Sequence, residues 1–281
     1  MPPLKLRSPK RLPSGGGLKA PSTSPIRFSS PQRGSQAYEE EAQAATSEVQ
    51  DIAWGDFLSI FAPLWKQGEH VTLYAATGQG KTTLALEILP IREYMMVFAT
   101  KQKYQKLFVT LQSQGFKVIK NFDNPPNPEV TPKVILHCAP SDTGAKARVK
   151  QKAVYGRALD YIYKAGGWGL YVDELKYVTD NLKLGSEMEL LYLQGRELGV
   201  SIIGTSQRPA WVPVVAIAES THLFIGAQSD QRDIDRIAEG SGRKGRVIRP
   251  LIDSLEDYQF LYVHTRSSKV PVYRVKVELT S

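Results

Sequence analysis

The chain has 281 residues, of which 42% are hydrophobic, and a formal net charge of +8 at pH 7. A chain of this length can bury one large core, and no stretch approaches the roughly 20 apolar residues needed to span a bilayer. The start of the sequence has no apolar segment of the secretory type, and a single cysteine, Cys138, excludes an intrachain disulfide. We therefore expect a soluble, cytoplasmic protein in which Cys138 is a buried free thiol.

Positive charge is concentrated in residues 1–36. This segment contains seven basic residues and no acidic one, which leaves a net charge of only +1 for residues 37–281. It is rich in Pro, Ser and Gly, and such a composition buries too little apolar surface to offset the entropy lost on ordering. We predict a disordered tail over residues 1–36 and one domain over residues 37–281. The tail could tether a nucleic acid or a protein partner, or act only as a solubilising extension.

Two helices are predicted before the first core strand. Residues 38–50 are acidic and suggest a short helix that leads into the domain. The next helix is predicted from apolar residues at helical spacing, and we expect it to pack on the core rather than to stack on nucleic-acid bases. Its apolar positions are Trp54, Phe57, Leu58, Phe61 and Trp65.

From residue 71 onward, short apolar runs alternate with helical stretches. This alternation is typical of α/β folds with a mainly parallel sheet covered by helices. Residues 123–132 predict a proline-rich surface loop, and β-like runs over 258–264 and 270–277 predict a C-terminal hairpin. The predicted strands are 71–75, 94–99, 133–138, 168–172, 200–205 and 221–225, and the predicted helices are 81–90, 101–114, 145–164, 186–198 and 229–238.

The segment from Ala75 to Thr83 lies between the first core strand and the next helix. It matches the phosphate-binding pattern G-x-x-x-x-G-K-[ST] except that Ala75 replaces the first glycine, which is tolerable if this residue only ends the strand. Lys81 supplies a charge for the β/γ-phosphates, and Thr82 offers a hydroxyl to Mg²⁺. An ordinary glycine-containing turn is the alternative. The expected nucleotide-binding residues are Ala75, Ala76, Thr77, Gly78, Gln79, Gly80, Lys81, Thr82 and Thr83.

A second segment, Gly169–Val172, is an apolar run followed directly by Asp173 and Glu174. Cleavage of a phosphate by water needs one group that holds Mg²⁺ and one that activates the water. We assign the metal to Asp173. Glu174, one residue further along, is assigned to orienting and deprotonating the water. An acidic pair can also merely solvate a strand end, so this assignment depends on the phosphate-binding segment upstream.

A third segment, Arg196–Pro209, combines a helix end, an apolar strand and two polar residues, Ser206 and Gln207, at the carboxyl end of that strand. Open α/β sheets build their sites at the carboxyl ends of strands. We therefore expect Gln207 to reach the γ-phosphate or the attacking water. The alternative is an amide that bonds to a neighbouring loop.

In order and spacing, the three segments resemble the FtsK/HerA superfamily of DNA-pumping ATPases. The resemblance covers about residues 70–240, and its most discriminating part is the Arg196–Pro209 segment, which has the Arg, Gly, apolar strand and Thr-Gln-Arg-Pro-like end of that family. The departures at Ala75 and Ser206 remove no functional group. The resemblance implies a RecA/ASCE-type P-loop NTPase that uses ATP and Mg²⁺. The small, tail-bearing architecture is most similar to viral genome-packaging ATPases, which act in the host cytoplasm or the virion.

The resemblance also implies a homo-oligomeric ring, a hexamer, with ATP at the subunit interfaces and double-stranded DNA in the centre. Such a ring needs an arginine donated across the interface. Arg196 is the first candidate and Arg208 the second, although either could instead pair with a local acid. Three basic clusters could contact DNA phosphates or be ordinary solvated patches. They are Lys101, Lys103 and Lys106; Lys146, Arg148, Lys150 and Lys152; and the loop 242–246.

The expected function is therefore ATP hydrolysis coupled to movement of double-stranded DNA into a viral capsid, with a capsid portal or vertex protein as a further partner. One alternative is a plasmid-transfer or chromosome-segregation pump that uses the same ring. The other is a nucleotide-gated adaptor in which slow hydrolysis only controls docking of the basic tail.

Overall fold

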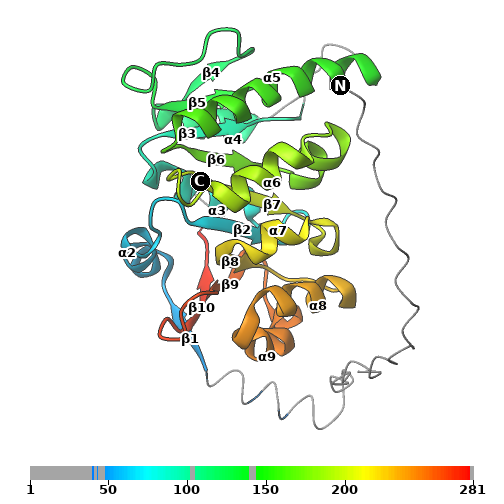
Figure 1. Cartoon of the computed structure of the whole chain (residues 1–281). Helices are drawn as coiled ribbons and strands as arrows, with labels where there is room; N and C mark the ends of the chain where they lie inside the picture. The colour runs from blue at the N-terminus through cyan, green and yellow to red at the C-terminus, as the bar shows by residue number, and fades with distance from the viewer. Residues whose placement is uncertain (1–39, 41–42, 44–47, 102–104, 139–143, 279–281) are drawn as a thin grey trace, which may run out of the picture.

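A computed structural model describes residues 40, 43, 48–101, 105–138 and 144–278. The predicted tail over residues 1–36, and most of the acidic helix predicted over residues 38–50, lie outside the described residues. The described part forms one ten-stranded sheet with helices on both faces (Figure 1). The predicted α/β class is confirmed.

The strand order is β1-β10-β9-β8-β2-β7-β6-β3-β5-β4. The seven strands from β8 to β4 pair in parallel, β9 is antiparallel to both of its neighbours, and β1 is parallel to β10. The strands are β1 (Val49–Ile52), β2 (His70–Tyr74), β3 (Met95–Phe98), β4 (Lys117–Ile119), β5 (Lys133–Leu136), β6 (Gly169–Val172), β7 (Ser201–Ser206), β8 (Ser220–Ile225), β9 (Gln259–His264) and β10 (Val272–Lys276).

The helices bury the two faces of the sheet in two separate hydrophobic clusters. α2 (Trp54–Leu64), α3 (Lys81–Ile88) and α4 (Gln105–Ser113) cover one face. The other face is covered by α5 (Ala145–Ala165), α6 (Gly185–Gln194), α7 (Val214–Ala218), α8 (Gln231–Gly240) and α9 (Gly245–Ile248), of which α5, α6 and α7 cross the front of Figure 1. Short 3-10 turns lie at Leu89–Ile91, Pro209–Trp211, Gly242–Lys244 and Arg249–Ser254, and a π-helical turn lies at Tyr177–Asn181.

The aromatic residues of α2 belong to the core, as their helical spacing predicted. Phe57 and Phe61 are fully buried, and both rings make edge contacts with Phe224 of β8 and Tyr262 of β9. These contacts attach α2 to the part of the sheet that contains the C-terminal hairpin. Aromatic pairs of this kind contribute about 0.5–1.5 kcal/mol each beyond the area that they bury.

The structure corrects several predicted elements. Residues 49 and 50, assigned to the end of the acidic helix predicted over 38–50, belong instead to β1. Asp51 of β1 accepts two hydrogen bonds of 2.5 and 2.7 Å from the guanidinium of Arg274 on β10. The partner of β1 lies at the far end of the chain, so no local pattern indicates this pairing. The short strand β4 was not predicted either. The helix predicted over 186–198 ends at Gln194, where turns begin that continue to Gly199.

Other expectations agree with the fold. β9 and β10 form the predicted antiparallel hairpin, and Cys138 is a buried free thiol whose pKa is raised by burial. In the described part of the chain, no helix is both long and apolar enough to cross a membrane.

Candidate nucleotide-binding site

The three sequence motifs meet at one edge of the sheet. β2, β7, β6 and β3 are neighbours in that order and run parallel, so their carboxyl ends lie side by side. β2 leads into the loop Ala75–Gly80, β6 into Asp173 and β7 into Gln207. The place where parallel strands end is the usual ligand site of an open α/β sheet.

The loop after β2 adopts the backbone that its glycines allow. Gly78 and Gly80 have φ values of +84° and +90°, in the region that side chains disfavour, and α3 begins at the next residue, Lys81. Ala75 is fully buried, and its side chain packs against Gly226, where an added Cβ would lie 2.7 Å from the Cβ of Ala75. Lys183 and Tyr258 are the two non-glycine residues with a positive φ in the described part, so the backbone of Ala75 does not require glycine.

The side chain of Lys81 folds back onto this loop instead of extending into solvent. Its Nζ donates a hydrogen bond of 2.8 Å to the carbonyl of Ala76 and another to the carbonyl of Ala75. Burial lowers the pKa of Lys81 to about 8, against the opposing effect of the carboxylates of Glu174 and Asp173. A cation held at the mouth of a loop of amide groups is suited to binding an anionic phosphate chain.

Asp173 is almost fully buried and firmly held. Its Oδ2 lies 2.5 Å from the Nζ of Lys101, and its Oδ1 accepts a hydrogen bond of 3.1 Å from the hydroxyl of Tyr171. The hydroxyl of Thr205 on β7 donates to the backbone carbonyl of Asp173. These contacts fix the carboxylate at the strand ends.

Glu174 follows Asp173 directly and is partly buried. Burial, and then the neighbouring Asp173 carboxylate, raise the pKa of Glu174, whereas Lys101, Lys81 and Lys176 lower it. A carboxylate with a raised pKa accepts a proton from water more readily than an ordinary one. Glu174 does not line the cavity described below, although it interacts electrostatically with Lys81.

Gln207 is connected directly to the phosphate-binding loop. The hydroxyl of Thr77 donates a hydrogen bond of 2.8 Å to Oε1 of Gln207. The end of β7 and the loop after β2 are therefore coupled through one side-chain contact, which a ligand bound between them would meet.

A cavity of about 310 Å³ lies between the phosphate-binding loop and the ends of β6 and β7. Lys81, Thr82, Asp173 and Gln207 therefore lie together, as expected. The lining residues are Thr77, Gly78, Gly80, Lys81, Thr82, Thr83, Lys101, Asp173, Gln207 and Tyr258.

The cavity also offers oxygen ligands for Mg²⁺. The hydroxyl of Thr82 and the carboxylate of Asp173 both line it, and Mg²⁺ in phosphate-binding sites uses one or two protein oxygens, with phosphates and water as its other ligands. Among the described residues no group of three or more His, Cys, Asp or Glu side chains could hold a metal without such help. The donors present fit a magnesium ion carried by a nucleotide.

The two candidate arginines occupy different places. Arg208 is bound within its own chain: its guanidinium lies 2.5 Å from Oδ2 of Asp230 and 2.7 Å from Oδ2 of Asp233. Arg196 is exposed, and its backbone packs against Gly68, just before the start of β2. Arg196 therefore lies at the amino-terminal end of β2, about 15 Å along this strand from the phosphate-binding loop at the other end.

Two residues of the cavity were not predicted as nucleotide ligands. Lys101 was considered only as a possible DNA contact, yet it pairs with Asp173, and Tyr258 was expected only as the start of a hairpin strand. Both reach the site through the path of the chain after β3 and before β9. No short motif marks either residue in the sequence.

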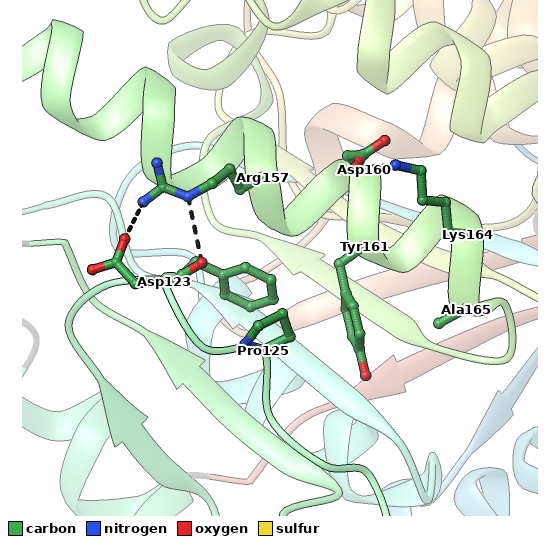
Figure 2. Close-up of a pocket in the computed structure, with 8 residues that line it drawn as sticks. Asp123, Pro125, Arg157, Asp160, Tyr161, Lys164 and Ala165 are labelled. Carbon is green, nitrogen blue, oxygen red and sulfur yellow. Dashed lines mark hydrogen bonds and ion pairs between the residues drawn. The ribbon is translucent and has the colours of Figure 1, made fainter.

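A second pocket, of about 460 Å³, lies at the C-terminal half of α5 (Figure 2). Arg157 pairs with Asp123 at 2.9 Å and Lys164 with Asp160 at 2.7 Å, so the charged groups of its wall neutralise one another. α5 ends here and leads into the start of β6, away from the strand ends that carry the motifs.

Comparisons with known proteins show which proteins the chain is similar to. No family model matches the chain. It is 27% identical over 171 residues to the DNA packaging ATPase P9 of Enterobacteria phage PRD1, a match that covers 59% of the chain and 66% of P9.

Two solved structures share the fold. The genome packaging NTPase B204 of Sulfolobus turreted icosahedral virus 2, in complex with AMPPCP, matches with a TM-score of 0.54 and 14% identity, over 76% of this chain and all of B204. VirB4 of Thermoanaerobacter pseudethanolicus matches with a TM-score of 0.56 and 11% identity, over 74% of this chain and 89% of VirB4.

The fold and the three motifs together define a P-loop NTPase, the class predicted from the sequence. Within that class, the chain is similar to viral genome-packaging ATPases of the FtsK/HerA type, and the resemblance noted in the sequence is confirmed.

Proposed function

We propose that this chain hydrolyses ATP to move double-stranded DNA, and that it packages a viral genome into a capsid. The observation that carries the proposal is the meeting of Lys81, Asp173 and Gln207 around one cavity, in a chain similar to the DNA packaging ATPase of phage PRD1. B204, which shares the fold, has been solved with ATP analogues.

Each residue has a distinct role in the proposed reaction. The amide groups of residues 75–83 and Lys81 bind the phosphate chain, and Thr82 and Asp173 hold the accompanying Mg²⁺, which neutralises charge on the phosphates. Glu174 takes a proton from the attacking water, and the raised pKa of its carboxyl supports this role. Gln207 contacts the γ-phosphate or the water and transmits its presence to Thr77.

The proposed assembly is a hexameric ring around duplex DNA. Arg196 is the better candidate for the arginine donated in trans, because it is exposed and lies at the edge of the sheet opposite to its own P-loop. In a head-to-tail ring, that edge can face the nucleotide of a neighbour. The ring would act in the host cytoplasm or in the virion, with a capsid portal or vertex protein as its partner and the basic N-terminal segment available to bind DNA.

The proposed chemistry is tested by Glu174→Gln, which keeps the shape of the side chain and removes the base. Turnover should fall by about 100-fold or more while ATP affinity stays within about threefold of wild type. The matched control is Glu189→Gln, at an exposed position of α6, which should leave both quantities unchanged. Normal turnover in Glu174→Gln would refute the assignment of the base.

The proposed coupling is tested by measuring ATP hydrolysis with and without duplex DNA. A translocase should hydrolyse ATP faster when duplex is present. Hydrolysis that stays slow and indifferent to DNA would favour the nucleotide-gated adaptor. If the protein moves duplex without any capsid component, and capsids do not increase its activity, a plasmid-transfer or chromosome-segregation pump becomes the better description.

A further inference from the structure

Tyr258 is held in an unusual conformation beside the phosphate-binding loop. Its φ is +65°, a left-handed backbone that a bulky aromatic residue rarely adopts. Such residues persist only where the surrounding structure holds them, and they concentrate at ligand sites. Tyr258 lies just before β9 and lines the same cavity as Lys81 and Asp173.

Three contacts hold this segment in place, one with the residue after β10 and two with the phosphate-binding loop. The carbonyl of Tyr258 accepts a hydrogen bond of 2.9 Å from the amide of Val277, and Asp257 accepts one of 2.8 Å from the side chain of Gln79. The Tyr258 ring packs on Gly80, where an added Cβ would lie 2.6 Å from the ring. The ring is therefore held against the loop, and Tyr258 as a residue is half-buried and lines the cavity.

The sheet topology places this ring on a particular side of the loop. Lys101, Asp173 and Gln207 all follow strands on one side of β2, namely β3, β6 and β7. β8 and β9 lie on the other side, and because β9 is antiparallel to β8, its beginning lies at the same edge as the loop. Tyr258 therefore faces the loop from the side opposite to Asp173 and Gln207.

The two sides of the loop can be assigned to the two ends of a bound nucleotide. The γ-phosphate must lie near the groups that cleave it, so the chain of phosphates points toward β7 and β6. The nucleoside end then extends toward β8 and β9, where the half-buried Tyr258 carries an aromatic ring. Such a ring can stack on any nucleobase, because every base has a π face.

We propose that the ring of Tyr258 stacks on the base of the bound nucleotide. This assignment rests on the proposed binding of ATP and adds a base-binding residue to it. Tyr258 contributes affinity for the nucleoside and none for the phosphates alone, and it does not by itself choose adenine over other bases.

The test compares the affinities of the full-length protein for ATP and for tripolyphosphate, which lacks the nucleoside. Tyr258→Asn removes the ring, and asparagine tolerates a left-handed backbone. We expect about tenfold weaker ATP binding and unchanged tripolyphosphate binding. Tyr258→Phe, which keeps the ring, should restore ATP affinity, and the control Tyr163→Asn on α5 should affect neither ligand.

A spectroscopic measurement on the wild-type protein needs no variant. The triphosphate of 2-aminopurine riboside, whose fluorescence is quenched by stacking, should be strongly quenched on binding. The assignment is overturned if wild-type protein binds this probe without quenching, if Tyr258→Asn binds ATP as tightly as wild type, or if it loses ATP and tripolyphosphate equally. Failure of the proposed ATP binding looks different, because wild-type protein would then bind neither ATP nor tripolyphosphate.

Discussion

Lys101 and Asp173 form an ion pair of 2.5 Å inside the cavity that the phosphate-binding loop lines. Helix α5 holds the two residues that precede Lys101. The carbonyl of Ala99 accepts a hydrogen bond from the hydroxyl of Tyr155, and the carbonyl of Thr100 accepts one from the side-chain amide of Gln151. The ammonium group thus neutralises the carboxylate that we assign to Mg²⁺. A metal ion that approaches Asp173 must compete with this lysine.

The first prediction concerns the magnesium requirement. Lys101→Met should lower the free Mg²⁺ concentration needed for half-maximal ATP hydrolysis by about threefold or more, because one positive charge beside Asp173 is removed. The measurement is a Mg²⁺ titration of the ATPase rate. Lys152→Met, at an exposed position of α5, is the matched control. An unchanged or higher Mg²⁺ requirement in Lys101→Met would contradict the competition.

A second prediction concerns the contact between Thr77 and Gln207. Gln207→Ala should reduce turnover at saturating ATP by about tenfold or more, because the group that senses the γ-phosphate is lost. Affinity for a non-hydrolysable ATP analogue should change by less than about threefold. Thr77→Val, which removes only the hydroxyl that holds Gln207, should give a smaller decrease. If Gln207→Ala lowers affinity and leaves turnover intact, Gln207 is a binding residue and not a sensor.

The two arginines should respond differently to truncation. Arg208→Ala leaves Asp233, which is 1% exposed, with the amide of Ala210 but without its ionic partner, so urea unfolding should show a loss of about 2 kcal/mol. Arg196→Ala should leave stability within about 0.5 kcal/mol of wild type and abolish turnover of the ring.

Mixing subunits tests whether Arg196 acts in trans. A ring that combines Arg196→Ala subunits with Glu174→Gln subunits contains interfaces at which an intact Arg196 meets an intact Glu174. Mixed rings should recover part of the turnover that each variant lacks alone. No recovery, in rings shown to contain both subunits, would count against donation across the interface.

His70 should make the protein sensitive to acid. Its Nδ1 accepts a hydrogen bond of 3.0 Å from the amide of Ile202, and burial lowers its pKa from 6.5 to about 4, although its contact with the carbonyl of Tyr192 opposes the shift. Below pH 6.5 the unfolded chain binds a proton that the folded chain refuses. Stability should therefore fall as the pH decreases from 6.5 to 4, by up to about 3 kcal/mol from this residue.

The measurement is urea unfolding at pH 7 and at pH 5. His70→Asn keeps an acceptor for Ile202 and does not titrate, so the variant should be less stable at pH 7 but should lose less stability on acidification. The same pH dependence in wild type and variant would show that His70 is not the group responsible.

Much of the site follows from the sequence because its groups come from short, contiguous motifs. The loop 75–83, Asp173 and Gln207 each follow an apolar strand, and parallel strands bring their carboxyl ends together whatever the details of packing. The positions of Lys81, Thr82, Asp173 and Gln207 around one cavity were therefore predictable.

The rest depends on contacts between distant parts of the chain. β1 forms only because β10 offers it an edge, and Arg274 supplies a partner for Asp51. Tyr258 lies beside the loop because β9 is antiparallel to β8 and so begins at the edge of the sheet where the loop lies. Contacts with Val277 and Gly80 hold its backbone in the left-handed conformation. Local periodicity carries no information about such partners, so neither feature could be found before the fold was known.

The central claim is that ATP hydrolysis at this site moves duplex DNA, and triplex displacement tests it most directly. A third strand bound at one end of a duplex is released when a motor travels along that duplex. Wild-type protein should release it with ATP and Mg²⁺ but not with a non-hydrolysable analogue, and Glu174→Gln should release none. Wild-type protein that hydrolyses ATP in the presence of the duplex but leaves the third strand in place would contradict the account.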